Sequence, residues 1–264
     1  MERLLVLRLE TVGVAAEASL NGVALARTSA ARRAVTVPIH EYTLAGANEL
    51  ALVIEPPPPG LPAAPQALLS DGRRGASLRL LLPRIGQLAH PEYARTLAQI
   101  DWAPLEGELT TTPHAIAQTV QLPIAFPRWR YFDMPPPPSP QALVAPIAAW
   151  LQGLAAALAR GDPEPLVQAA RLRFEDLALA YQRNLADDVG RLRLQIQQLH
   201  AQAPLQPPLP QPDALLLRPQ ADGRIFECLD AGGEPVLRSE VAGGGRVAWP
   251  LRVAWIDDRC YVVR

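Results

Sequence analysis

The densest group of side chains able to contact a ligand is the run Pro127-Arg128-Trp129-Arg130-Tyr131-Phe132-Asp133. Guanidinium groups stack on aromatic faces, and exposed rings beside a carboxylate suit a sugar or another planar ligand. The run therefore predicts a ligand-binding surface at Trp129, Tyr131 and Asp133. The alternative that we favour is a last strand, because side chains alternate in a strand. Trp129 and Tyr131 would then cover one face of a sheet while the arginines point to solvent.

A second set of candidate ligand-binding residues is aromatic and lies near the C-terminus. Trp255 and Tyr261 fall in two expected strands, on either side of Asp257-Asp258. If the sheet curls, these rings line a pocket between the sheet and the helices that precede it. The alternative that we favour is that they fill the core between helices and sheet. The two aspartates predict a tight turn and not a catalytic pair, because Asp is a typical turn residue.

Motifs that hold a metal, a cofactor or a catalytic nucleophile are missing from the sequence. The four histidines have none of the spacings of sequence-local metal ligands, and there is no GxGxxG, GxxxxGK[ST] or GxSxG. Cys228 and Cys260 lack a CxxC spacing. We expect two reduced core cysteines, with a contact between their strands left open. No cofactor and no metal is expected.

Composition and charge narrow the class of protein. Hydrophobic residues make up 49% and charged residues 19%, with a net charge of -1, which is typical of a soluble globular chain and gives no field to attract nucleic acid or an anionic membrane. All 25 cations are arginine. They are scattered, so we attribute them to a GC-rich bacterial genome and not to an anion site.

The start, MERLLVLRLE, is typical of a strand and not of a signal peptide, and the run Ala142–Leu151 is too short to cross a bilayer. A cytoplasmic location is expected.

The first half of the chain predicts antiparallel strands. Asn21-Gly22 is the strongest hairpin signal, because both central positions of such a turn need a positive φ. Short strands with short turns predict an all-β sandwich, with residues 56–75 as a long loop. The expected strands are 3–10, 17–20, 23–27, 34–39, 49–54, 76–82, 96–102 and 116–122.

Residues 20–54 resemble the galactose-binding-like jelly-roll domain of family 2 glycoside hydrolases. The residues that carry the resemblance are the hairpin Asn21-Gly22 and the G-x-N-x-L pattern of Gly46, Asn48 and Leu50. In that family this domain is a non-catalytic scaffold. The family's catalytic glutamate segment is not recognisable here, and 264 residues leave no room for its catalytic barrel. The resemblance implies a scaffold.

A run of prolines predicts the domain boundary, because stiff polyproline cannot continue a strand ladder. We expect a β-sandwich domain at 1–133, a polyproline linker at 134–140 and an α+β domain at 141–264. In that last domain, helices at about 139–160, 162–184 and 187–202 precede an antiparallel sheet. The second helix should turn Glu175 and Asp176 to solvent. The expected strands are 214–218, 224–229, 235–241, 246–249, 251–256 and 259–264.

The order of helices followed by a curved antiparallel sheet resembles an NTF2-like domain. Together these features favour a non-catalytic binding or assembly protein whose partner is another protein or a second copy, with no nucleic acid and no membrane as partner. One alternative is a small-molecule enzyme, which needs at least two polar titratable groups in a pocket of the C-terminal domain. Another is a carbohydrate-binding module, which needs Trp129 or Tyr131 exposed beside Asp133.

Overall fold

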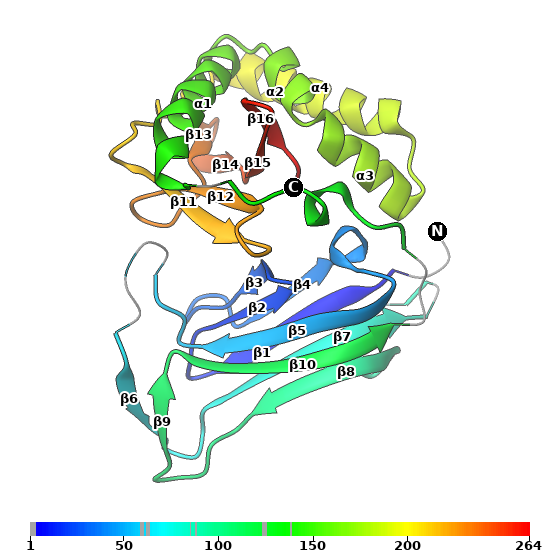
Figure 1. The fold of residues 1–264 in the computed structure, drawn as a ribbon, viewed down its shortest axis with the longest axis vertical. Coiled ribbons are helices and arrows are strands. Elements are labelled where there is room, and N and C mark those ends of the chain that lie inside the picture. Colours follow the sequence, from blue (N-terminus) through cyan, green and yellow to red (C-terminus); the bar gives the residue numbers. More distant parts are fainter. Residues whose placement is uncertain are drawn as a thin grey trace. The chain divides into compact units, whose positions relative to one another are not determined.

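The chain folds into two compact units, the first ending at Trp129 and the second beginning at Arg130 (Figure 1). The chain is rich in β-sheet, and every pairing between its described strands is antiparallel, as the sequence predicted. The α-helices in the described part of the chain all belong to the second unit. The computed structural model describes residues 4–58, 61, 64–84, 86–87, 89–122, 126–137 and 139–264.

Two four-stranded sheets make up most of the first unit. In one the strand order is β4-β1-β7-β8, with bounds Ala34–Pro38, Val6–Val12, Gly75–Pro83 and Ala94–Trp102. In the other it is β10-β5-β2-β3, with bounds His114–Leu122, Gly46–Ile54, Ala16–Leu20 and Val23–Arg27. Two short strands, β6 (Gln66–Leu69) and β9 (Leu109–Thr112), form a separate pair.

The core of the first unit follows the two-residue period of its strands. Leu50, Leu52 and Ile54 of β5 are fully buried and alternate with residues that reach solvent. Leu78 and Leu80 of β7 show the same alternation and burial. Each sheet therefore buries one face, and removing that apolar area from water is the main force that holds the unit together.

The two turn motifs of residues 20–54 are hydrogen bonded to one another. Asn21 and Gly22 have φ of 52° and 73° and join β2 to β3, which confirms the predicted hairpin. The Asn21 amide Nδ2 donates to the Tyr42 carbonyl and to Asn48 Oδ1, each at 2.8 Å. Asn48 is buried, and its Oδ1 also accepts from the Leu44 backbone N–H at 2.7 Å. The motif thus fixes a buried amide cluster, in which each polar group has a partner.

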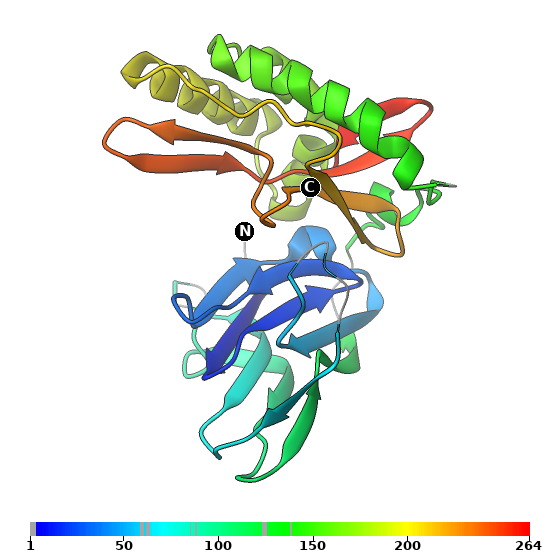
Figure 2. The ribbon, with the colours of Figure 1, turned by 90° about the vertical axis from the view of Figure 1, so that its left-hand side faces the viewer.

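In the second unit, helices lie over one side of an antiparallel sheet (Figures 1 and 2). The sheet has the strand order β11-β12-β15-β16, and β13 and β14 pair separately. The helices are α1 (Val144–Ala159), α2 (Glu164–Ala169), α3 (Arg171–Tyr181) and α4 (Leu185–Gln202). The strands are β11 (Leu215–Gln220), β12 (Ile225–Asp230), β13 (Leu237–Val241), β14 (Gly245–Trp249), β15 (Arg252–Ile256) and β16 (Arg259–Val262).

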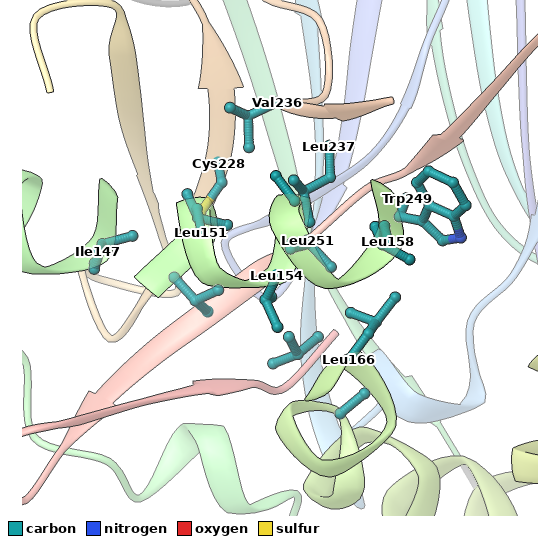
Figure 3. Close-up of a cluster of buried hydrophobic side chains, with 14 of the residues drawn as sticks. Ile147, Leu151, Leu154, Leu158, Leu166, Cys228, Val236, Leu237, Trp249 and Leu251 are labelled. Atoms are coloured by element: carbon teal, nitrogen blue, oxygen red, sulfur yellow. The ribbon is translucent and has the colours of Figure 1, made fainter. Parts of the chain in front are cut away.

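The core of the second unit lies between α1 and the sheet (Figure 3). Leu151, Leu154 and Leu158 recur at helical spacing on α1 and pack in one cluster with Cys228 and Leu251. The apolar segment is longer than the sequence analysis assumed. Gln141–Ala159 spans 19 residues with a mean hydropathy of 1.8, so by length and composition it is able to cross a membrane.

Several predicted boundaries in the second unit differ from those observed. The predicted helix 162–184 is two helices, α2 and α3, which meet at the buried Ala170. Neither glycine nor proline marks this break, so packing and not local propensity sets it. Ser139-Pro140 begins a 3₁₀ turn, η3 (Gln141–Leu143), and the α-helix starts only after it. The cap of α4 is Asn184, whose side chain accepts from the Ala186 N–H at 2.9 Å, so this helix begins before the predicted residue 187.

Other differences lie within the first unit and at the predicted boundary between the two domains. The strand predicted at 127–133 is wrong, because Arg130–Phe132 is a 3₁₀ turn, η2. The predicted loop 56–75 contains β6, which pairs with the equally unpredicted β9. Residues 130–137 and 139–140, where a linker was expected from 134, lie in the second compact unit; residue 138 is outside the described residues.

Candidate functional site

The aromatic run at 127–133 does not form an exposed ligand surface. Trp129 is 1% exposed, and its indole Nε1 donates to the Thr43 carbonyl at 2.7 Å within the first unit. Tyr131 is 0% exposed and packs in the second unit, where the Arg264 guanidinium lies 4.5 Å from its ring centroid. Of the three predicted residues only Asp133 is exposed. The two rings are therefore core residues of different units.

A buried ion pair lies behind Tyr131. Arg264 Nη1 donates to Asp176 Oδ2 at 2.8 Å, and both side chains are buried. The expectation that Asp176 faces solvent is therefore wrong, since its partner comes from the far end of the chain. On the surface beside it, Arg130 Nη1 donates to Glu175 Oε2 at 2.5 Å. The first and last residues of the second unit, Arg130 and Arg264, thus both form ion pairs with α3. These ion pairs have a structural role.

Trp255 and Tyr261, by contrast, line an open groove of about 680 Å³ in the second unit. Both rings are partly exposed, and Trp255 also packs against the core cluster of the second unit, so it both borders the groove and covers part of the core, as each alternative expected. The groove lies between α1, α2 and the hairpin of β15 and β16. Its described lining residues are Pro146, Trp150, Gly153, Leu154, Pro165, Gln168, Ala169, Trp255, Asp258, Arg259, Cys260 and Tyr261.

Local sequence explains why these side chains meet. Asp257 and Asp258 have φ of 47° and 58°, and this tight turn, which the sequence predicted, places Trp255 directly across from Cys260. On α1, the groove-lining residues Pro146, Trp150 and Leu154 recur every fourth position and so share a face. Sequence analysis missed Trp150. The available signal was a proline and a tryptophan one turn apart on a helix whose other residues, apart from Gln152 and Gly153, are aliphatic.

The polar groups of the groove are arranged for contact and not for acid–base chemistry. Burial raises the pKa of the Cys260 thiol to about 12, so the thiol is protonated near neutral pH and is a poor nucleophile. Asp258 and Arg259 are exposed at the turn. Among the described residues, none accepts a hydrogen bond from the indole N–H of Trp150 or Trp255. These donors are therefore available to a ligand.

One proline-rich segment of the chain already lies along α1. Residues 203–212 run beside this helix in Figure 2. The Gln152 Nε2 of α1 donates to the Pro210 carbonyl at 2.7 Å, while Leu205, Pro207 and Pro210 are buried. The helix thus holds this segment through one side-chain amide, while Leu205 packs in the core cluster to which α1 also contributes.

Metal ligands are not gathered anywhere in the described part of the chain. No group of three or more His, Cys, Asp or Glu residues there is arranged to hold a metal ion. His40 is buried, and its Nε2 accepts from the Leu5 backbone N–H at 2.8 Å, which is a structural contact. Gly243 and Gly244 have positive φ and lie in the loop between β13 and β14.

Comparison with known proteins gives no match. No family model, no curated protein and no solved structure is similar to this chain. Function is therefore inferred from the geometry of the groove and from the chemistry of the residues that line it.

Proposed function

We propose that this chain is a non-catalytic binding protein that docks a proline-rich segment of another protein in the groove of its second unit. One observation carries the proposal: Trp150, Trp255 and Tyr261 line one open groove, partly exposed. A polyproline segment has no internal hydrogen bonds, and its carbonyls need donors from a partner. Aromatic grooves bind such segments because rings pack against proline and indole N–H groups supply those donors.

The contact between Gln152 and Pro210 supports this choice of ligand. It is an intramolecular example of an extended, proline-rich segment held on α1 by one donor and buried apolar side chains. Pro146 and Pro165 border the groove and add flat apolar surface without donors of their own. The groove is open to solvent and not enclosed, which suits a segment of another chain better than a fully buried metabolite.

The same proposal extends to the fold. We take the first unit to be a β-sandwich that serves as a scaffold, and the second to be an α+β domain that carries the binding groove. The first unit has two four-stranded sheets, and the second has a sheet covered by helices, which supports this division. The resemblances to a galactose-binding-like domain and to an NTF2-like domain stay predictions, as does the cytoplasmic location.

The two alternative functions have less support. An enzyme using the groove would need an activated group, but the pKa of Cys260 is raised to about 12 and Asp258 lies exposed at a turn. A carbohydrate module needs an exposed ring beside Asp133, whereas Trp129 and Tyr131 are buried.

Titration with a decaproline peptide tests the proposal. Isothermal titration calorimetry should show saturable binding of decaproline, and none of a glycine–serine peptide of equal length. Trp255→Ala or Trp150→Ala should weaken binding about ten-fold or more, because aromatic side chains at such contacts contribute most of the binding energy. Tyr93→Ala removes an exposed ring of the first unit and should change nothing. Binding that survives both tryptophan substitutions, or no binding at all, would overturn the proposal.

A further inference from the structure

A second cavity of about 210 Å³ lies in the second unit and shares no described lining residue with the groove. Leu166 of α2, Phe174 of α3 and Leu251 before β15 form part of its apolar lining. The volume equals that of roughly seven waters, so it suits a molecule of similar size. A cavity lined only by such residues would stay dry.

Trp249 makes this cavity more than a packing defect. The side chain is 8% exposed and lines the cavity, and its indole Nε1 is buried with no hydrogen-bond acceptor among the described residues. Figure 3 shows the indole at the edge of the core cluster, with its nitrogen turned away from Leu158 and Leu251. A buried donor without an acceptor costs about 1–3 kcal/mol, so native proteins seldom retain one unless something else accepts the bond.

Two further donors border the same cavity. Arg173 of α3 supplies a guanidinium and Gln195 of α4 supplies an amide, and both side chains reach solvent. No aspartate or glutamate is among the described residues that line the cavity. The lining therefore combines an apolar interior with one cation and two neutral hydrogen-bonding groups, which is the chemistry that recognises a carboxylate attached to a short apolar chain.

We propose that this cavity binds a small apolar monocarboxylate, whose carboxylate accepts from the Trp249 indole while its alkyl chain packs between Leu166, Phe174 and Leu251. Arg173 and Gln195 select the anion at the mouth of the cavity. This site is separate from the groove of the proposed function, and either proposal can fail without the other.

Isovalerate, with its neutral amide isovaleramide as the matched uncharged probe, tests the proposal on the full chain. The ¹⁵N–¹H signal of the Trp249 indole, assigned from its loss in Trp249→Phe, should shift saturably with isovalerate. Isovaleramide should bind about ten-fold more weakly or worse, because it lacks the charge that strengthens hydrogen bonds. Equal binding of the two probes, or no saturable shift because the cavity holds only water, would overturn the proposal.

Surface substitutions separate recognition from folding. Arg173→Gln should weaken isovalerate binding about ten-fold or more, since it removes the cation. Gln195→Ala, on the exposed side of α4, should weaken it several-fold. Arg171→Gln changes an exposed arginine on the same helix, which pairs with Glu175 and does not line the cavity, and it should leave binding unchanged. If Arg171→Gln weakens binding as much as Arg173→Gln does, the proposed site is wrong.

Discussion

The roles of the tryptophans follow from the surroundings of each indole nitrogen. The nitrogen of Trp129 donates to a backbone carbonyl, and that side chain is core. The nitrogen of Trp249 is buried without an acceptor among the described residues, which leads to the proposed carboxylate cavity. Trp150 and Trp255 are partly exposed in the groove. Residue type alone does not separate these cases, because an indole suits both a core and a binding surface.

The environment of Cys260 leads to a prediction about its reactivity. A thiol reacts as the thiolate, and burial raises the pKa of Cys260 to about 12. At pH 8 its alkylation by iodoacetamide should be roughly a thousand-fold slower in the native protein than in urea, where the pKa returns to about 8.5. The native rate should rise with pH up to about 12, because a raised pKa moves ionisation upward.

Peptide-resolved mass spectrometry measures this rate for each cysteine separately. Cys228 is an internal control, because full burial raises its pKa as well and it should be at least as slow. Rapid native alkylation of Cys260 at pH 8 would show an activated thiol. It would then favour the enzyme alternative for the groove over the binding function.

Some side chains are positioned by residues close to them in sequence, and these could be placed from the sequence. Side chains positioned by residues far away in sequence could not. Trp255 and Tyr261 were recognised as candidates for a pocket, although core filling was favoured, because the turn that positions them is local. Asp176 was expected at the surface, and nothing near it in sequence indicates Arg264, which is 88 residues away. Trp150 was missed because a helix face that lines a groove has the same apolar spacing as one that packs in a core.

At the scale of elements, alanine substitutions at two glycines should change the free energy of unfolding in opposite directions. The difference arises because one glycine lies in a closely packed turn and the other does not. Gly161 follows α1 with a φ of 70°, and a Cβ there would lie 2.7 Å from the His200 ring of α4. Gly161→Ala should therefore lower the free energy of unfolding by about 1–3 kcal/mol, from backbone strain and steric overlap. Gly190 lies inside α4 with open space around it, so Gly190→Ala should raise that free energy by about 0.5–1 kcal/mol.

Urea unfolding of the two variants beside the unmodified chain measures both effects. The pair is informative because both changes add the same methyl group. A loss of stability in Gly190→Ala, or none in Gly161→Ala, would mean that the contact between this turn and α4 is not as tight as described.

Elements with a local signal were predictable from sequence, and elements defined by distant partners were not. The turns at Asn21-Gly22 and Asp257-Asp258 need positive φ, and their residue types indicate this directly. β6 and β9 are short, and each is paired with residues at least forty positions away, as Gln66 is with Thr112. The separation of α2 from α3 at Ala170 also lacks a local signal, since alanine favours a continuous helix.

At the scale of the whole molecule, the proline run was expected to separate two domains. The division between the two compact units falls earlier along the chain, between Trp129 and Arg130. The segment just after that point belongs to the second unit by its contacts. Tyr131 packs against Arg264, and Arg130 pairs with Glu175 of α3. Arg130 and Tyr131, which the sequence analysis assigned to the β-sandwich domain, are therefore held by contacts within the second unit.

Two truncated chains distinguish these boundaries. A fragment of residues 130–264 should fold cooperatively, because it retains the contacts of Tyr131 and Arg130 within its own unit. A fragment of residues 141–264, cut at the sequence-based boundary, should be less stable by about 2–4 kcal/mol. It loses a fully buried tyrosine and leaves the ring face of the Arg264 guanidinium uncovered.

Urea unfolding of both fragments, with Tyr131→Ala in the longer one as a control, measures the difference. The control should account for most of the loss, because Tyr131 supplies most of the buried area. If the two fragments unfold at the same urea concentration, residues 130–140 add no stability to the second unit, as expected if the boundary is the predicted linker 134–140.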